Sequence, residues 1–147
     1  MKNILLIGGS YGIGLAIAKA LANDNNVFVA SRTAEGLSDL NVTHLTFDAQ
    51  TDTLDVSKLP AVIDGLVYCP GSINLRPFKG LKIETFESDL QINFIDMVKV
   101  VQTVLPQLTA SNQSSIVLFS SVAASMGMPF HTSVAAAKGA IEGFAKA

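Results

Sequence analysis

A run of glycines behind a short apolar segment constrains this chain more than any other feature. The apolar run Ile4–Ile7 leads into glycines at positions 8, 9, 12 and 14, and residues 15–21 then read Leu-Ala-Ile-Ala-Lys-Ala-Leu. This order predicts a strand, a glycine turn and a helix start. Glycines permit positive φ and let a ligand approach closely, and the first turn of a helix offers free N–H groups to an anion. The stretch from Gly8 to Gly14 therefore indicates a pyrophosphate site.

The spacing of these glycines separates the stretch from the common dinucleotide fingerprint. The fingerprint is Gly-x-Gly-x-x-Gly, whereas this chain has Gly-x-x-x-Gly-x-Gly. The alternative interpretation is a tight strand-to-helix turn that binds nothing. If the site is real, its expected cofactor contacts are Gly8, Gly9, Ser10, Tyr11, Gly12, Ile13 and Gly14.

Composition limits the remaining possibilities. The chain has 147 residues, of which 49% are hydrophobic and 15% charged, so we expect one globular domain with a sizeable core. A net charge of -2 argues against a nucleic-acid partner. No segment suits a signal peptide or a membrane span, and the single cysteine, Cys69, is expected to be a small core residue. These features predict a cytoplasmic protein without a membrane partner.

Apolar runs alternate with helical patterns along the rest of the chain, as in an α/β protein with βαβ units. The last of the expected strands is continuous and apolar, which is typical of a strand buried on both faces. Further strands are expected at Val27–Ala30, Leu45–Asp48, Ala61–Tyr68 and Ser115–Ser120, and helices at Phe86–Leu108, beginning near Ile83, and at Thr132–Ala147.

The long helix carries apolar residues on two faces rather than one. Such a helix is covered on both sides, either by a second subunit or by loops of the same chain. We expect a homo-oligomer, a dimer or tetramer, in the first case. The two faces comprise Leu90, Phe94, Met97, Val98, Val101, Val104, Leu105 and Leu108, and then Ile92, Ile95 and Val100.

The residues after the second strand indicate which nucleotide binds. In a βαβ unit this position meets the adenosine ribose, where a carboxylate takes the 2′-hydroxyl and an arginine can face a 2′-phosphate. The chain continues with Ser31 and Arg32 and has no acid before Glu35. The sequence therefore favours NADP(H) over NAD(H), although an ordinary exposed arginine would look the same.

Together these residues resemble the short-chain dehydrogenase/reductase family, whose members are NAD(P)-dependent. The family's turn is Thr-Gly-x-x-x-Gly-x-Gly, and only the threonine differs here, where Ile7 stands. The resemblance implies a doubly wound parallel sheet, the Rossmann fold with three α/β/α layers, and places Asp48 and Ala49 at the adenine ring. The family's Asn-Asn-Ala-Gly turn is replaced by Tyr-Cys-Pro-Gly at residues 68–71, which keeps only Gly71.

The resemblance also implies an active site. Asn93 matches the helix asparagine of the proton relay, Ser121 in Phe-Ser-Ser-Val-Ala matches the catalytic serine, and Lys138 matches the lysine of Tyr-x-x-x-Lys, which holds the nicotinamide ribose. The tyrosine position is Val134, and valine donates no proton. His131 is the upstream residue that could take over, because imidazole titrates near neutrality.

Two functions follow from the resemblance. The first is an oxidoreductase that moves hydride between NADP(H) and a small carbonyl or alcohol substrate. The second is a non-catalytic NADP(H)-binding protein, such as a redox sensor or an inactive partner subunit, which Val134 favours. The family continues beyond the length of this chain, so we expect residues 1–147 to be a single Rossmann domain truncated within its sixth helix.

Overall fold

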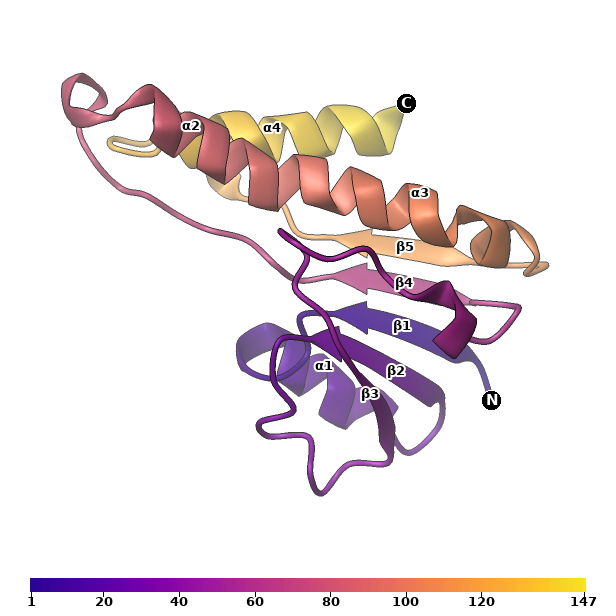
Figure 1. Cartoon of the computed structure of the whole chain (residues 1–147). Helices are drawn as coiled ribbons and strands as arrows, with labels where there is room; N and C mark the ends of the chain where they lie inside the picture. The colour runs from indigo at the N-terminus through magenta and orange to yellow at the C-terminus, as the bar shows by residue number, and fades with distance from the viewer.

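The computed structural model describes residues 1–147 and contains a single five-stranded parallel sheet in the order β3-β2-β1-β4-β5 (Figure 1). The order reverses direction at β1, because β2 and β3 lie on one side of it and β4 and β5 on the other. This confirms the doubly wound α/β prediction. The strands are β1 (Asn3–Ile7), β2 (Asn26–Ser31), β3 (Val42–Thr46), β4 (Gly65–Tyr68) and β5 (Ser115–Leu118).

Helices cover both faces of the sheet. Helix α1 (Gly12–Leu21) buries Ala18 in a cluster on one face, and α3 (Asp96–Thr109) packs with α4 (Thr132–Lys146) against the larger cluster on the other. Successive side chains of a strand point to opposite faces of the sheet, so Leu5 packs in the cluster on the α3 side and Leu6 in the cluster on the α1 side. The result is the expected three-layer sandwich (Figure 1).

The predicted long helix is present but has an irregular middle. It consists of α2 (Ile83–Leu90), a π-helical turn (Gln91–Ile95) and α3, which lie end to end in Figure 1. Asp96 N–H bonds to the carbonyl of Gln91, five residues earlier, which defines the π-turn. On α3, Met97 and Val104 are fully buried, whereas Leu105 is 47% exposed. The expected homo-oligomer through this helix stays a prediction.

The boundaries of the third and fourth strands were predicted wrongly. The third strand begins at Val42 and ends at Thr46, because Val42 pairs with Val27, whereas Leu45–Asp48 was expected. Only one of its residues is buried, so the sequence carries a weak strand signal there. The fourth strand is shorter than predicted: residues 61–64 precede the ladder, and the N–H of Ile63 bonds instead to the carbonyl of Gln107 near the end of α3.

The fifth strand corrects an expectation about burial. Ile116 and Val117 are 41% and 47% exposed, although a strand buried on both faces was predicted. Within residues 1–147, β5 pairs with β4, and neither side chain belongs to a core cluster.

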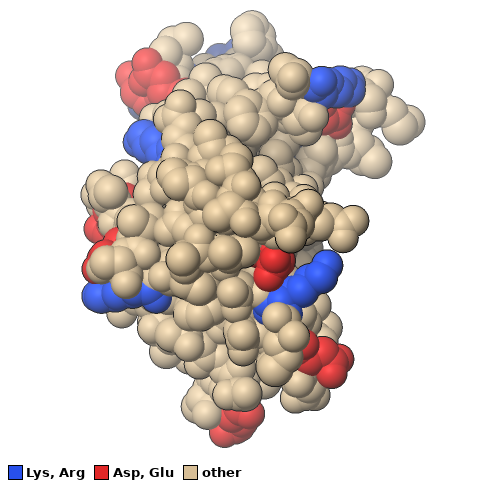
Figure 2. Space-filling view, turned by 90° about the vertical axis from the view of Figure 1, so that its right-hand side faces the viewer, with Lys and Arg blue, Asp and Glu red and all other residues tan.

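The surface shows no segregation of charge on the face displayed in Figure 2, where acidic and basic side chains lie scattered among uncharged residues. No helix in the structure combines the length and the apolar character that a bilayer crossing requires.

Candidate functional site

The glycine turn between β1 and α1 is shaped by close backbone contacts. Gly8 has φ of +79°, and its N–H donates to the carbonyl of Ala30 at 2.8 Å, which ties the turn to β2. A Cβ on Gly14 would lie 2.1 Å from the carbonyl oxygen of Gly8, so only glycine lets the helix begin this near the strand. A Cβ on Gly9 would meet Val29 at 2.6 Å. Glycine at position 9 therefore allows close packing against β2, and Gly9 does not line the cavity described below.

The N-terminus of α1 is open to a ligand. Its N-cap residue Tyr11 makes no side-chain capping bond, and the first turn holds no acidic residue. The N–H groups and the positive end of the helix dipole are therefore available to an anion. Gly12 also has a positive φ, +58°, with no atom within 4 Å of a Cβ placed there.

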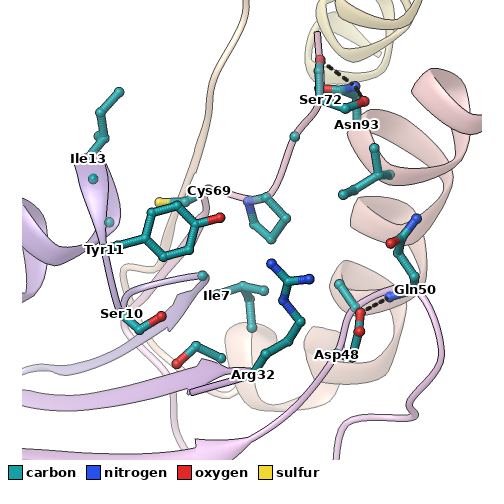
Figure 3. A pocket seen from close by; sticks show the side chains of 18 of the residues that line it. Ile7, Ser10, Tyr11, Ile13, Arg32, Asp48, Gln50, Cys69, Ser72 and Asn93 are labelled. Atoms are coloured by element: carbon teal, nitrogen blue, oxygen red, sulfur yellow. Dashed lines mark hydrogen bonds between the residues drawn. The ribbon is translucent and has the colours of Figure 1, made fainter. Parts of the chain in front are cut away.

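The carboxyl end of β2 supplies a free cationic side chain. Arg32 is exposed, takes part in neither ion pair of the structure, and points into the pocket in Figure 3. Its neighbour Ser31 is buried, and its hydroxyl donates to the carbonyl of Thr33 at 2.7 Å. Asp48 follows β3, and its Oδ1 accepts from the N–H of Gln50 at 3.0 Å, which fixes the carboxylate at the same edge.

These elements surround one cavity of ≈ 460 Å³ at the carboxyl ends of the strands, the usual ligand position in such sheets (Figure 3). It brings together every expected cofactor residue except Gly9, and three of the four expected catalytic residues, Asn93, Ser121 and Lys138. Further lining residues that the sequence reasoning missed are Ile7, Ala30, Phe47, Gln50, Cys69, Pro70, Ser72, Ile73, Ile92 and Val134. Most of these lie at the carboxyl ends of strands or in the loops that follow them, which is the signal that could have found them.

Asn93 sits in the π-turn and is fully buried. Its Nδ2 donates to the carbonyl of Asp89 at 2.8 Å and to Ser72 Oγ at 3.2 Å, whereas its Oδ1 has no partner. A Cβ on Gly71 would lie 2.8 Å from that Oδ1 and 3.6 Å from the Nζ of Lys138. Glycine at 71 therefore keeps open the place where both groups can reach a ligand.

Lys138 reaches the cavity from α4. Its Nζ donates to the carbonyl of Phe119 at 2.8 Å, and burial lowers the pKa of its ammonium. No carboxylate pairs with it, so two of its three N–H groups remain for a ligand. Ser121 follows β5, and its Oγ accepts from the N–H of Ala123 at 3.2 Å. That hydroxyl keeps its proton free to donate.

Neither Val134 nor His131 offers a proton donor in the cavity. Val134 is buried one helical turn before Lys138, and His131 lies outside the lining, with its Nδ1 2.6 Å from the carbonyl of Pro129. Tyr11 is exposed at the glycine turn, away from Asn93 (Figure 3). Cys69, expected in the core, is instead half-buried in the lining, where desolvation raises the pKa of its thiol to about 11.

Comparison with known proteins now adds to this geometry. The family model described as short chain dehydrogenase matches residues 2–147. The chain belongs to this family. Retinol dehydrogenase 8 of Homo sapiens is 30% identical over 97% of this chain, and hydroxysteroid 11-beta-dehydrogenase 1-like protein A of Xenopus laevis is 29% identical over 97%. A short chain dehydrogenase from Shigella flexneri shares the fold with a TM-score of 0.87 and 25% identity, over 97% of this chain and 64% of that one.

As a short-chain dehydrogenase, the chain belongs to a family of oxidoreductases that use nicotinamide nucleotides. It spans about half the length of the curated relatives it matches, 51% of the human protein and 55% of the Xenopus one. The cavity fits such a nucleotide, because an uncapped helix end and an unpaired guanidinium face it where glycines leave room.

Proposed function

We propose that this short-chain dehydrogenase moves hydride between NADP(H) and a carbonyl or alcohol substrate. The observation that carries the proposal is one continuous cavity. Its lining includes the open N-terminus of α1 and Arg32 as well as Asn93, Ser121 and Lys138. An anion site and a polar reaction site within one cavity suit a long cofactor whose charged and reactive parts lie far apart.

The proposed role of each residue follows from the hydrogen-bonding groups that it presents to the cavity. The turn residues Gly8 to Gly14 would hold the pyrophosphate, Asp48 with Ala49 the adenine, and Lys138 the nicotinamide ribose hydroxyls. When bound, the nucleotide supplies or accepts the hydride. Ser121 has a free hydroxyl proton with which to hold a substrate oxygen, and Asn93 presents an unpaired Oδ1 beside Gly71.

The preference for NADP(H) rests on Arg32, whose guanidinium can bind a 2′-phosphate through charge-assisted hydrogen bonds. Arg32→Glu is expected to weaken NADPH binding by about 10–100-fold, the equivalent of ~1.5–3 kcal/mol for bonds to a charged group. Binding of NADH should change far less. The measurement is nucleotide titration followed by NAD(P)H fluorescence.

Arg76→Glu is the matched control for that titration, because it makes the same change of charge outside the cavity. Equal loss of NADPH affinity in both variants, or equal loss of NADPH and NADH affinity in Arg32→Glu, would contradict the assignment of a 2′-phosphate to Arg32.

Reduction of a carbonyl by hydride transfer also needs a proton donor. By the sequence resemblance, Val134 stands where the family carries its tyrosine. His131 lies outside the lining and is given no role. Val134 is also what favours the second function, nucleotide binding without turnover. Loss of a general acid forfeits about 10²–10⁴-fold in rate unless another group replaces it.

Consumption of NADPH distinguishes the two functions. Purified protein is first titrated with NADPH, and loss of NADPH absorbance is then followed with a panel of carbonyl compounds, with alcohols and NADP⁺ in the reverse direction. The panel includes retinol and a hydroxysteroid, since relatives carry those names and exposed Ile73, Met126 and Phe130 lie on the loops after β4 and β5. Binding without consumption across the panel would support the non-catalytic function.

A further inference from the structure

A buried carboxylate lies directly behind the cavity, and none of the roles above uses it. Asp89 at the end of α2 is fully buried, and neither ion pair of the structure includes it. A buried carboxylate without a cation is costly unless hydrogen bonds compensate it. Three donors do so: Ser72 Oγ at 2.5 Å and Asn74 Nδ2 at 2.8 Å bond to Oδ1, and Ser133 Oγ at 2.7 Å bonds to Oδ2.

Only one of these three donors reaches the cavity. Ser72 is part of the lining, whereas Asn74 and Ser133 are not. Figure 3 shows Ser72 beside Asn93, at the end of the pocket away from Ser10. Ser72 thus connects a buried carboxylate with the space that Asn93 and Gly71 border.

The hydrogen bonds of Ser72 leave one position free. A serine hydroxyl has one proton and two lone pairs. The proton goes to Asp89, and one lone pair accepts from Asn93 Nδ2 at 3.2 Å. The second lone pair has no partner among the hydrogen bonds of the structure, so it can accept the proton of a substrate hydroxyl.

We propose that Ser72 and Asp89 exchange the proton of the reaction, in the place of the side chain that Val134 cannot provide. This inference rests on the proposed function. In alcohol oxidation the carbinol carbon loses a hydride to the oxidised nicotinamide nucleotide. The hydroxyl proton of the alcohol passes to Ser72 Oγ as the serine proton passes to Asp89 Oδ1, leaving a carbonyl and a neutral carboxyl. In reduction the same proton returns from Asp89 through Ser72 to the substrate oxygen.

In this scheme Ser72 is the catalytic residue, and Asp89 acts through it. The arrangement also explains why a charged side chain stands at a fully buried position of α2, where an apolar residue would pack at lower cost. A carboxylate with a structural role alone could hold the loop after β4, α2 and α4 together just as well if none of its donors lined the cavity.

The test compares two isosteric substitutions. Ser72→Thr keeps the hydroxyl and Ser72→Val removes it, so their difference isolates the hydroxyl. In alcohol oxidation we expect Ser72→Val to lower kcat by about 10²-fold, the lower range for a lost acid–base group, and Ser72→Thr to recover most of it. The dissociation constant of NADPH should be the same in both. Equal kcat values for the two variants would overturn the proposal while leaving the proposed function intact.

Asn74→Ala measures how much the hydrogen bonds to Asp89 contribute to stability alone. It removes a donor to the same carboxylate, and this donor does not line the cavity. It should lower the free energy of unfolding as Ser72→Val does, yet lower kcat by less than Ser72→Val. A kcat loss as large as that of Ser72→Val would show that the network acts only by holding the site together, and would overturn the relay.

Infrared difference spectroscopy gives a readout independent of rate. After one oxidative turnover with the products retained, the proton should reside on Asp89 and produce the carbonyl band of a protonated carboxyl. The band should be missing in Asp89→Asn and in Ser72→Val. Its persistence in Asp89→Asn would overturn the relay. Failure of the unmodified protein to bind any nicotinamide nucleotide would instead overturn the proposed function itself.

Discussion

At the scale of single residues, glycines in this chain differ in what they permit, and Gly14 is the most constrained. A Cβ at Gly14 would meet the backbone of Gly8 at 2.1 Å, whereas a Cβ at Gly139 in α4 would meet nothing within 4 Å. Gly14→Ala is expected to destabilise the fold by about 1–3 kcal/mol or more, as overpacking does. Gly139→Ala should stabilise it by roughly 0.5–1 kcal/mol, since glycine inside a helix costs entropy. Urea unfolding followed by circular dichroism measures both, and like signs would contradict the contact at Gly14.

At the scale of elements, the π-turn between α2 and α3 positions Asn93, and β4 supports that turn. The hydroxyl of Tyr68, buried at the end of β4, donates to the carbonyl of Ile92 at 2.9 Å. Tyr68→Phe removes this hydrogen bond, so we expect it to destabilise the protein by about 0.5–1.5 kcal/mol near neutral pH and to lower kcat through Asn93. Chemical denaturation and steady-state kinetics on the same samples measure the two effects.

The same substitution carries a pH dependence whose sign can be stated. Burial, with Asp96 and Asp48 adding to it, raises the pKa of Tyr68 far above the ordinary value of 10.0. Above pH 10 the unfolded chain releases this proton and the folded chain keeps it, so unfolding becomes more favourable as pH rises. The stability advantage of the unmodified protein over Tyr68→Phe should therefore shrink above pH 10. A constant difference up to pH 11 would show that Tyr68 is not shielded as the structure indicates.

At the scale of the whole molecule, the cavity joins the ends of β1, β2 and β4 to α4, so a ligand there should stabilise the fold globally. At a concentration of 100 Kd, NADPH is expected to add about 2.7 kcal/mol to the free energy of unfolding. For a domain of this size each kcal/mol corresponds to ~2–4 °C in Tm. Differential scanning calorimetry with and without NADPH checks this, with adenosine as a control that lacks the phosphates. An unchanged Tm at saturating NADPH would contradict the cavity as its site.

Much of the fold and part of the cavity lining can be predicted from the sequence alone, because the sequence patterns that indicate them involve residues close together in the chain. The spacing of Gly8, Gly12 and Gly14 depends on neighbours within one turn, and it predicted the strand–turn–helix unit, whose glycines line the cavity. The alternation of apolar strands and helical patterns predicted the doubly wound sheet. Arg32 could be found for the same reason, since it directly follows a strand.

The tertiary structure decided whatever depends on residues far apart in the chain. A strand with a single buried residue carries a weak signal, so the third strand was expected at Leu45–Asp48, and only its pairing with β2 shows its bounds, Val42–Thr46. The role of Gly9 depends on the side chain of Val29, and His131 falls outside a cavity whose walls come from other elements. Ser72, Asp89 and Ser133 carry no motif. Only the packing of α2, α4 and the loop after β4 brings the two serine hydroxyls into hydrogen bonds with the buried carboxylate of Asp89, beside Asn93.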